Sequence, residues 1–307
     1  MKRTTTTTER LDIFASVTDA IIAELEKGPE AWSAGWCSSA DVWDPRNLET
    51  GKAYRGVNVL VLALTMLQRG YTQNLWLTFN QARARGGNVR KGSKGVHLVF
   101  WRPITRKNDG DNTTDDTQGD DEDGRKRMMA KPFVVFNVAD CDGVNAPIDA
   151  TPEEGGFSRL EAAESIITAS GAEIQPGRPS YLPDLDIIRL PERSAFLSAE
   201  SYYATAFHEL THWTAPRVSR EVQFKRWGDE SYAMEELVAE LGAAMLCGVT
   251  GVPALSQCAA YLNSWIRVLK SDKRAIFSVA GRAQKAADYL LSRAGLADEE
   301  ERDQSAA

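Results

Sequence analysis

The chain has 307 residues, of which 43% are hydrophobic and 26% charged, and its formal net charge is −7. These proportions are those of a globular protein, and the length is sufficient for two domains that each bury a core. The longest apolar run, residues 57–67, is too short to span a bilayer. No apolar signal segment precedes the first acidic residues, and the four cysteines form no Cys-x-x-Cys pair. We therefore expect a cytoplasmic protein with reduced thiols and no membrane partner.

The spacing of apolar residues predicts an α+β N-terminal half. Apolar residues recur at helical intervals three times, and Gly28-Pro29 ends the first of these segments. Two runs rich in Val and Phe indicate β-strands. Helices are expected over residues 10–27, 58–69 and 78–85, and strands over residues 96–101 and 133–138.

Charge is strongly segregated in this half of the chain. Residues 50–107 contain eleven Lys or Arg and no Asp or Glu, whereas residues 108–124 contain eight acids and no basic residue. The basic block indicates an electropositive surface for a polyanion, with a solvated face paired to acids elsewhere as an equal alternative. The acidic stretch has no periodicity and almost no apolar residues, so we expect residues 108–128 to be a disordered insertion between the two strands.

Two prolines and three glycines in residues 142–156 predict a boundary between an N-terminal domain, residues 1–145, and a C-terminal domain, residues 146–307. The pattern beyond this boundary is mostly helical, and Ser198 is the expected N-cap of one helix. A turn-rich stretch is expected over residues 175–183, a strand over residues 186–190, and further helices over residues 158–170, 232–248, 259–270 and 275–294.

Residues 208–212 read His-Glu-Leu-Thr-His and contain two of the three histidines in the chain. Residues four apart share one face of a helix, so His208 and His212 can bind the same metal ion. Glu209 would then act as general base on a water held at that metal, as the His-Glu-x-x-His pattern of zinc hydrolases indicates. We expect Zn²⁺ as the cofactor, with another divalent ion such as Mn²⁺ as the alternative.

The third metal ligand is expected to be a carboxylate, because catalytic zinc takes three protein ligands and His97 lies in the basic block. Glu236 and Glu240 lie one turn apart on an apolar helix, with a spacing that resembles the Glu-x-x-x-Asp motif of thermolysin-like gluzincins. That resemblance implies Glu236 as the ligand and Glu240 as the acid that orients a liganding histidine. The reverse assignment stays open, and Glu235 is expected to face outward. The alternative is that the histidines are ordinary helix residues and the acids form salt bridges.

Aromatic and basic residues interleave in the basic block, beside glycines 86, 87, 92 and 95. Glycines let backbone amides approach phosphates, basic side chains neutralise them, and exposed rings stack on unpaired bases. Trp76 and Phe79 are expected in the core. The candidates for contact with single-stranded DNA (ssDNA) are Tyr54, Arg55, Arg85, Arg90, Lys91 and Lys94.

Several of these segments resemble a known family. Residues 47–58, 76–81 and 86–95 resemble the N-terminal domain of ArdC-type antirestriction proteins. Residues 202–213 and 235–240 resemble the zincin-like metallopeptidase domain fused to it in that family. The resemblance implies a conjugative-plasmid protein that binds ssDNA non-specifically and protects it from host restriction. The alternative is an active metalloprotease, with Glu209 as its base, that the DNA-binding domain delivers to a protein substrate.

Overall fold

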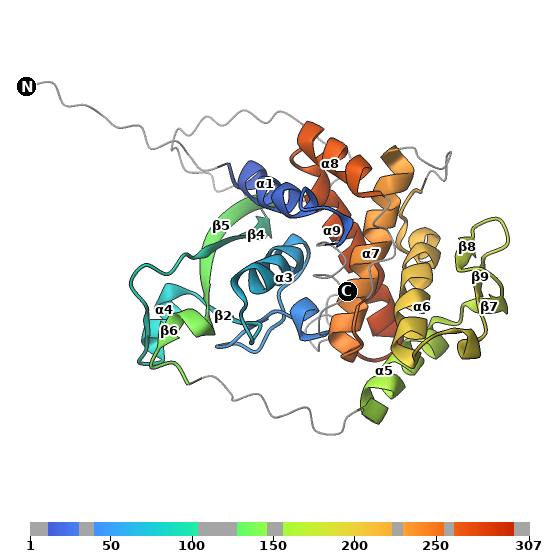
Figure 1. The fold of residues 1–307 in the computed structure, drawn as a ribbon, viewed down its shortest axis with the longest axis horizontal. Helices are drawn as coiled ribbons and strands as arrows, with labels where there is room; N and C mark the ends of the chain where they lie inside the picture. The colour runs from blue at the N-terminus through green and yellow to red at the C-terminus, as the bar shows by residue number, and fades with distance from the viewer. Residues whose placement is uncertain are drawn as a thin grey trace, which may run out of the picture.

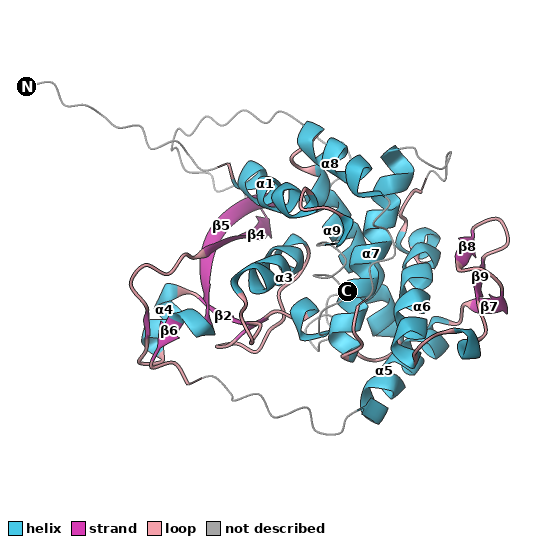
Figure 2. Ribbon diagram, viewed as in Figure 1, coloured by secondary structure: helices cyan, strands magenta, loops and turns pink. Residues whose placement is uncertain are grey.

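A computed structural model describes residues 12–30, 40–103, 128–145, 156–222, 230–254 and 261–297 (Figure 1). The expected acidic insertion, residues 108–128, lies outside the described residues except at its last position, and most of the expected boundary segment also lies outside them. Within the described residues the N-terminal part is α+β and the C-terminal part is mostly helical (Figure 2). The fold class predicted from the sequence is therefore confirmed.

The helices of the N-terminal part begin and end where local chemistry dictates. Asp12 caps the first helix by accepting hydrogen bonds from two backbone amides. Gly70 ends the second in the left-handed conformation (φ 64°) that glycine adopts without steric cost. Thr78 and Gln81 form a capping box at the third. These helices are α1 (Ile13–Leu25), α3 (Val57–Arg69) and α4 (Phe79–Ala84), with 3-10 turns at Ala40–Trp43 and Val138–Asp140.

A four-stranded sheet of order β1-β2-β5-β4 lies against α1 and α3 (Figure 1). Its strands are β1 (Arg46–Asn47), β2 (Leu75–Leu77), β4 (Val96–Pro103) and β5 (Met128–Asn137), and a separate ribbon joins β3 (Asn88–Val89) to β6 (Cys141–Asp142). The open edge of β4 is covered by Asn58 of α3, which donates to the Val99 carbonyl (2.8 Å) and accepts from its amide (3.0 Å). This pairing fixes α3 on the sheet and protects the edge from other strands.

The C-terminal part consists of packed helices and a small three-stranded sheet of order β7-β9-β8, which lies at their edge beside α6 (Figure 1). The helices are α5 (Gly156–Ser170), α6 (Ala199–Trp213), α7 (Glu230–Thr250), α8 (Leu262–Ser271) and α9 (Ala275–Arg293), with 3-10 turns η3 (Arg193–Ala195) and η4 (Ala215–Val218). The strands are β7 (Glu173–Pro176), β8 (Ser180–Leu182) and β9 (Ile187–Leu190). The expectation of turns holds for residues 177–179 and 183 but was wrong for residues 175–176 and 180–182, because pairing with β9 makes strands of two short segments that lack alternation. No helix among the described residues is long and apolar enough to cross a bilayer.

The two parts share one continuous hydrophobic core. Helix α1 packs on α8, α3 packs on α9, and the 3-10 turn Ala40–Trp43 packs on α7. Hydrogen bonds follow the same contact: Thr18 donates to the Lys273 carbonyl (2.7 Å), and the Gly56 amide donates to the side chain of Gln284 (2.9 Å). The helices of the C-terminal part are therefore held in place partly by the N-terminal part.

The close approach of α6 and α7 depends on a glycine. A Cβ atom at Gly242 would lie 2.6 Å from Cγ2 of Thr211, which is fully buried. Gly242→Ala is therefore expected to lower the free energy of unfolding by about 1–3 kcal/mol through overpacking, measured by urea denaturation. Gly281→Ala on α9, where a Cβ would meet nothing within 4 Å, is the control and is expected to be neutral or stabilising. Equal effects of the two substitutions would contradict this role for Gly242.

Candidate metal centre

Helix α6 carries the His-Glu-Leu-Thr-His motif in its buried C-terminal half. Ser198 caps the helix as expected, with its hydroxyl accepting from the Ser201 amide at 3.2 Å in a capping box. The rings of His208 and His212 lie 5.0 Å apart, centroid to centroid, and both side chains are buried. Two imidazoles on one face of a rigid helix are thus available to a single metal ion.

Helix α7 places the carboxylate of Glu236 between the two histidines. Its oxygens lie 3.4 Å from Nε2 of His208 and 3.7 Å from Nε2 of His212. One ligand atom from each of the three side chains lies within 4.8 Å of the others. Tetrahedral zinc, with bonds of about 2.0–2.1 Å, requires donors about 3.3–3.4 Å apart. The donor set and its spacing therefore fit one divalent ion.

Each histidine has a second carboxylate behind its other ring nitrogen. Nδ1 of His208 lies 3.6 Å from Glu240, and Nδ1 of His212 lies 3.2 Å from Glu235. Carboxylates in this position orient a metal-binding imidazole and raise its basicity. The gluzincin resemblance implies this place for Glu240, and its role as an orienting acid stays a prediction. The expectation that Glu235 faces outward was wrong, since its side chain is only 6% exposed.

Arg220 explains how Glu235 can be buried. Its guanidinium lies 2.9 Å from the Glu235 carboxylate and donates to the Thr211 carbonyl at 2.7 Å. Without such a cation, a buried carboxylate would be strongly destabilising. Arg220 lies 15 residues before Glu235 and outside α7, so sequence spacing gave no signal for the pair.

The electrostatics of the cluster favour a bound cation. Burial lowers the pKa of His208, but the carboxylates of Glu236 and Glu240 raise it to about 10. Burial raises the pKa of Glu209. The two histidines and a hydrogen bond from the backbone of Tyr181 lower this pKa and so oppose the effect of burial. The carboxylates outnumber the one arginine, so a divalent ion would relieve their mutual repulsion. The four buried acids are Glu209, Glu235, Glu236 and Glu240.

Tyr232 is a further polar residue of the site that the sequence interpretation missed. Its hydroxyl is hydrogen-bonded to Glu236 and to Tyr261, and burial together with Glu236 raises its pKa well above the usual range. Tyr232 precedes Glu236 by four residues, one turn of α7. That spacing was the available signal. The phenol holds the Glu236 carboxylate in a fixed orientation.

The candidates for ssDNA contact are dispersed over the N-terminal part, and three of them are ion-paired. Arg55 lies 2.5 Å from Asp288 of α9, Arg85 lies 2.8 Å from Glu49, and Arg90 lies 3.3 Å from Asp142. Each arginine would have to exchange its carboxylate for a phosphate. The Tyr54 hydroxyl accepts from Asn47 at 3.1 Å and is half-buried, whereas Lys91 and Lys94 are exposed.

The two aromatic residues expected in the core behave differently. Trp76 is fully buried and donates its indole N–H to Asn74 at 2.6 Å. Phe79 is 47% exposed, so its expected burial was wrong. It lies in the first turn of a six-residue helix whose one buried residue is Ala82, and Arg83 lies over its ring at 6.0 Å. Phe79 is therefore a surface aromatic beside a basic side chain.

A His-Glu-x-x-His helix that packs on a second helix bearing a nearby carboxylate, Glu236, is typical of a zincin-like metallopeptidase domain, and residues 161–282 match the family described as zincin-like metallopeptidase. Residues 11–136 match the family described as the N-terminal domain of anti-restriction factor ArdC. The chain belongs to the ArdC family of antirestriction proteins. The resemblance stated from the sequence is thereby confirmed for both domains.

Solved structures and curated relatives extend this likeness over most of the chain. The antirestriction ArdC protein from plasmid R388 is 38% identical in its metal-free structure (TM-score 0.71; 94% of this chain, 100% of that one). Its Mn(II)-bound structure is 39% identical (TM-score 0.72; 92% and 98%). The uncharacterized protein y4eC of Sinorhizobium fredii is 36% identical over 91% of each chain. DNA primase TraC of Escherichia coli is 35% identical over 90% of this chain, which spans only 27% of the primase.

Proposed function

We propose that this chain is an antirestriction protein that binds ssDNA without sequence preference and shields incoming plasmid DNA from restriction in the host cytoplasm. The observation that carries the proposal is a group of basic side chains, Arg69, Lys91 and Lys94, which we term the basic turn. Arg69 donates to the Lys94 carbonyl at 2.6 Å, which joins the end of α3 to the loop before β4. Within the described residues none of the three has a carboxylate partner. Their charge is therefore available to phosphates.

Exposed rings complement this charge. Phe79 is 47% and Phe100 is 58% exposed, and α4, which carries Phe79, packs beside β3, next to the basic turn. Stacking on such rings holds unpaired bases without reading their sequence. In a duplex, stacking between neighbouring base pairs covers the faces of the bases, so single strands are the expected ligand.

The basic turn can be tested by fluorescence anisotropy with oligothymidylate and a duplex of equal length. Wild type is expected to prefer the single strand, with affinity that falls steeply as salt rises. Lys91→Ala/Lys94→Ala should weaken binding and reduce the salt slope by about 0.7 for each phosphate that is no longer neutralised. Arg267→Ala/Lys270→Ala on α8 removes the same charge from two acid-paired residues and is the control. A preference for duplex, or equal losses in both variants, would reject the proposal.

We further propose that His208, His212 and Glu236 hold a divalent metal, Zn²⁺ or an ion such as Mn²⁺, with Glu240 and Glu235 orienting the histidines. When bound, such an ion supplies Lewis-acid chemistry that acidifies water or polarises a carbonyl. Glu209 follows His208 directly on α6, and its carboxylate is buried at the same site. It is therefore placed to accept a proton there.

An active metallopeptidase that cleaves a protein substrate is the second candidate function, and the buried Glu209 is the observation that favours it. Glu209→Gln keeps the side chain's size and removes its basicity. For shielding by ssDNA binding, we expect the variant to retain metal, ssDNA binding and protection of a conjugating plasmid in a restricting host. Loss of protection with binding intact would instead favour the peptidase. Metal content, anisotropy and transconjugant counts provide the three measurements.

A further inference from the structure

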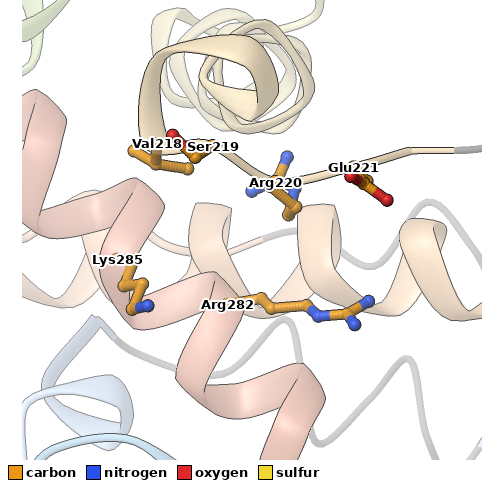
Figure 3. Close-up of a pocket in the computed structure, with 6 residues that line it drawn as sticks. All are labelled: Val218, Ser219, Arg220, Glu221, Arg282 and Lys285. Atoms are coloured by element: carbon orange, nitrogen blue, oxygen red, sulfur yellow. The ribbon is translucent and has the colours of Figure 1, made fainter. Parts of the chain in front are cut away.

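A second polar site lies on the C-terminal part, beside the metal centre but distinct from it. A cavity of about 290 Å³ opens between the segment that follows η4 and helix α9 (Figure 3). Such a cavity is many times the share of one water molecule, about 30 Å³. Its lining consists of Val218, Ser219, Arg220, Glu221, Arg282 and Lys285.

The cavity is electropositive, since three of its lining residues are basic and one is acidic. Arg282 and Lys285 lie three residues apart on α9, across the cavity from the segment of residues 218–221 (Figure 3). In the part of the chain that the structure describes, neither has a carboxylate partner. Like charges held together in this way favour an anion between them.

Arg220 forms the buried wall of the cavity. Its side chain is only 3% exposed, and its Nε atom has no hydrogen-bond partner among the described residues. Burial lowers the pKa of Arg220, the Glu235 carboxylate raises it, and the nearby charge of Arg282 lowers it again. Arg282 is therefore close enough to repel Arg220, and an anion between them would remove that repulsion.

The same helix connects the cavity to the N-terminal part. On the neighbouring face of α9, Asp288 pairs with Arg55, and a hollow of about 140 Å³ is lined by both of them and by Tyr54. Lys285 precedes Asp288 by three residues, one helical turn. Arg55 of the N-terminal part and Lys285 of the cavity thus lie on adjacent faces of α9, with Asp288 between them.

We infer that this cavity binds a backbone phosphate of the single strand that the N-terminal domain holds, so that the strand continues onto the zincin-like domain. The inference rests on the proposed ssDNA binding and adds a second contact to it. A phosphate accepts hydrogen bonds from Arg and Lys, and the contact of the N-terminal part with α9, next to the cavity, favours a strand over a free ion. Glu221 at the cavity discourages ligands with several clustered negative charges.

The test uses the full chain and the double variant Arg282→Ala/Lys285→Ala. Both residues are exposed helix positions where alanine is favourable, whereas Arg220 is left intact because it supports Glu235. The control is again Arg267→Ala/Lys270→Ala, an equally charged pair with the same spacing on α8. Affinity is measured by anisotropy with oligothymidylates of about 4 to 16 nucleotides.

Long oligonucleotides are expected to bind the double variant more weakly, with a salt slope smaller by about 0.7 for each phosphate that the variant no longer binds. The shortest should bind wild type and variant alike, because it occupies the N-terminal domain alone. Equal behaviour of variant, control and wild type at every length would overturn the inference while leaving ssDNA binding standing. If wild type does not bind ssDNA, both the proposed function and the inference about the cavity are overturned. Thermal stabilisation by inorganic phosphate that only this variant loses, with long-oligonucleotide affinity unchanged, would assign the cavity to a free phosphate.

Discussion

Arg220→Ala is expected to lower the free energy of unfolding by about 3–5 kcal/mol, because it leaves the carboxylate of Glu235 buried without its cation. The Arg220 and Glu235 side chains are 3% and 6% exposed, so little solvent screens the charge that remains. The loss extends to the metal site, since Glu235 also orients His212 at 3.2 Å. Metal affinity should therefore fall by about 10–100-fold in the same variant. Denaturation in the presence of a chelator separates the two effects.

A double-mutant cycle isolates the buried pair. Glu235→Gln keeps a hydrogen-bonding side chain beside His212 but removes the charge that Arg220 balances. We expect Arg220→Ala/Glu235→Gln to be less destabilised than the sum of the single variants, with a coupling energy of about 0.5–3 kcal/mol. Arg267→Ala, which breaks an exposed pair with Glu230, should cost less than about 1 kcal/mol. Additive single effects would show that the two side chains do not depend on each other.

Local patterns were sufficient for the metal helices and insufficient for what surrounds them. The four-residue spacing of His208 and His212 on α6, and of Glu236 and Glu240 on α7, is a property of the helix and could be read directly. The orientation of Glu235 could not be read from the sequence, because it depends on the guanidinium of Arg220, which follows η4. The sequence pattern alone assigned Glu235 to solvent, and only its tertiary partner Arg220 reverses that assignment.

In the N-terminal part, too, sequence patterns predicted the elements but not the contacts between them. Helix α3 and strand β4 follow from periodicity, yet the bond between Asn58 and the edge of β4 joins residues far apart in sequence. The basic block likewise predicted positive charge, but not whether that charge is free to bind phosphates. Arg55 and Arg85 are paired with Asp288 and Glu49, which lie outside the basic block. Lys91 and Lys94 are exposed. The electrostatic surface is thus decided by tertiary contacts that composition cannot supply.

Glu236→Gln is expected to weaken metal binding by more than the roughly 10–100-fold that removal of an orienting carboxylate costs. Its two oxygens lie 3.4 Å from Nε2 of His208 and 3.7 Å from Nε2 of His212. Glu240→Gln, which changes the group behind Nδ1 of His208, should stay within that smaller range. Glu209→Gln should leave affinity unchanged. Competition with a chromogenic chelator gives the three affinities, with wild type as reference.

The order of these losses decides between the two assignments of the acidic residues. A larger loss for Glu240→Gln than for Glu236→Gln would make Glu240 the ligand and contradict the geometry. Stability supplies an independent measure, since metal at about 100 times its Kd stabilises a protein by about 2.7 kcal/mol. Wild type and Glu209→Gln should gain that amount when metal is added, and Glu236→Gln should gain almost none. Tyr232 is hydrogen-bonded to Glu236. Tyr232→Phe should therefore lose part of the stabilisation by metal, because the Glu236 carboxylate is no longer held in one orientation.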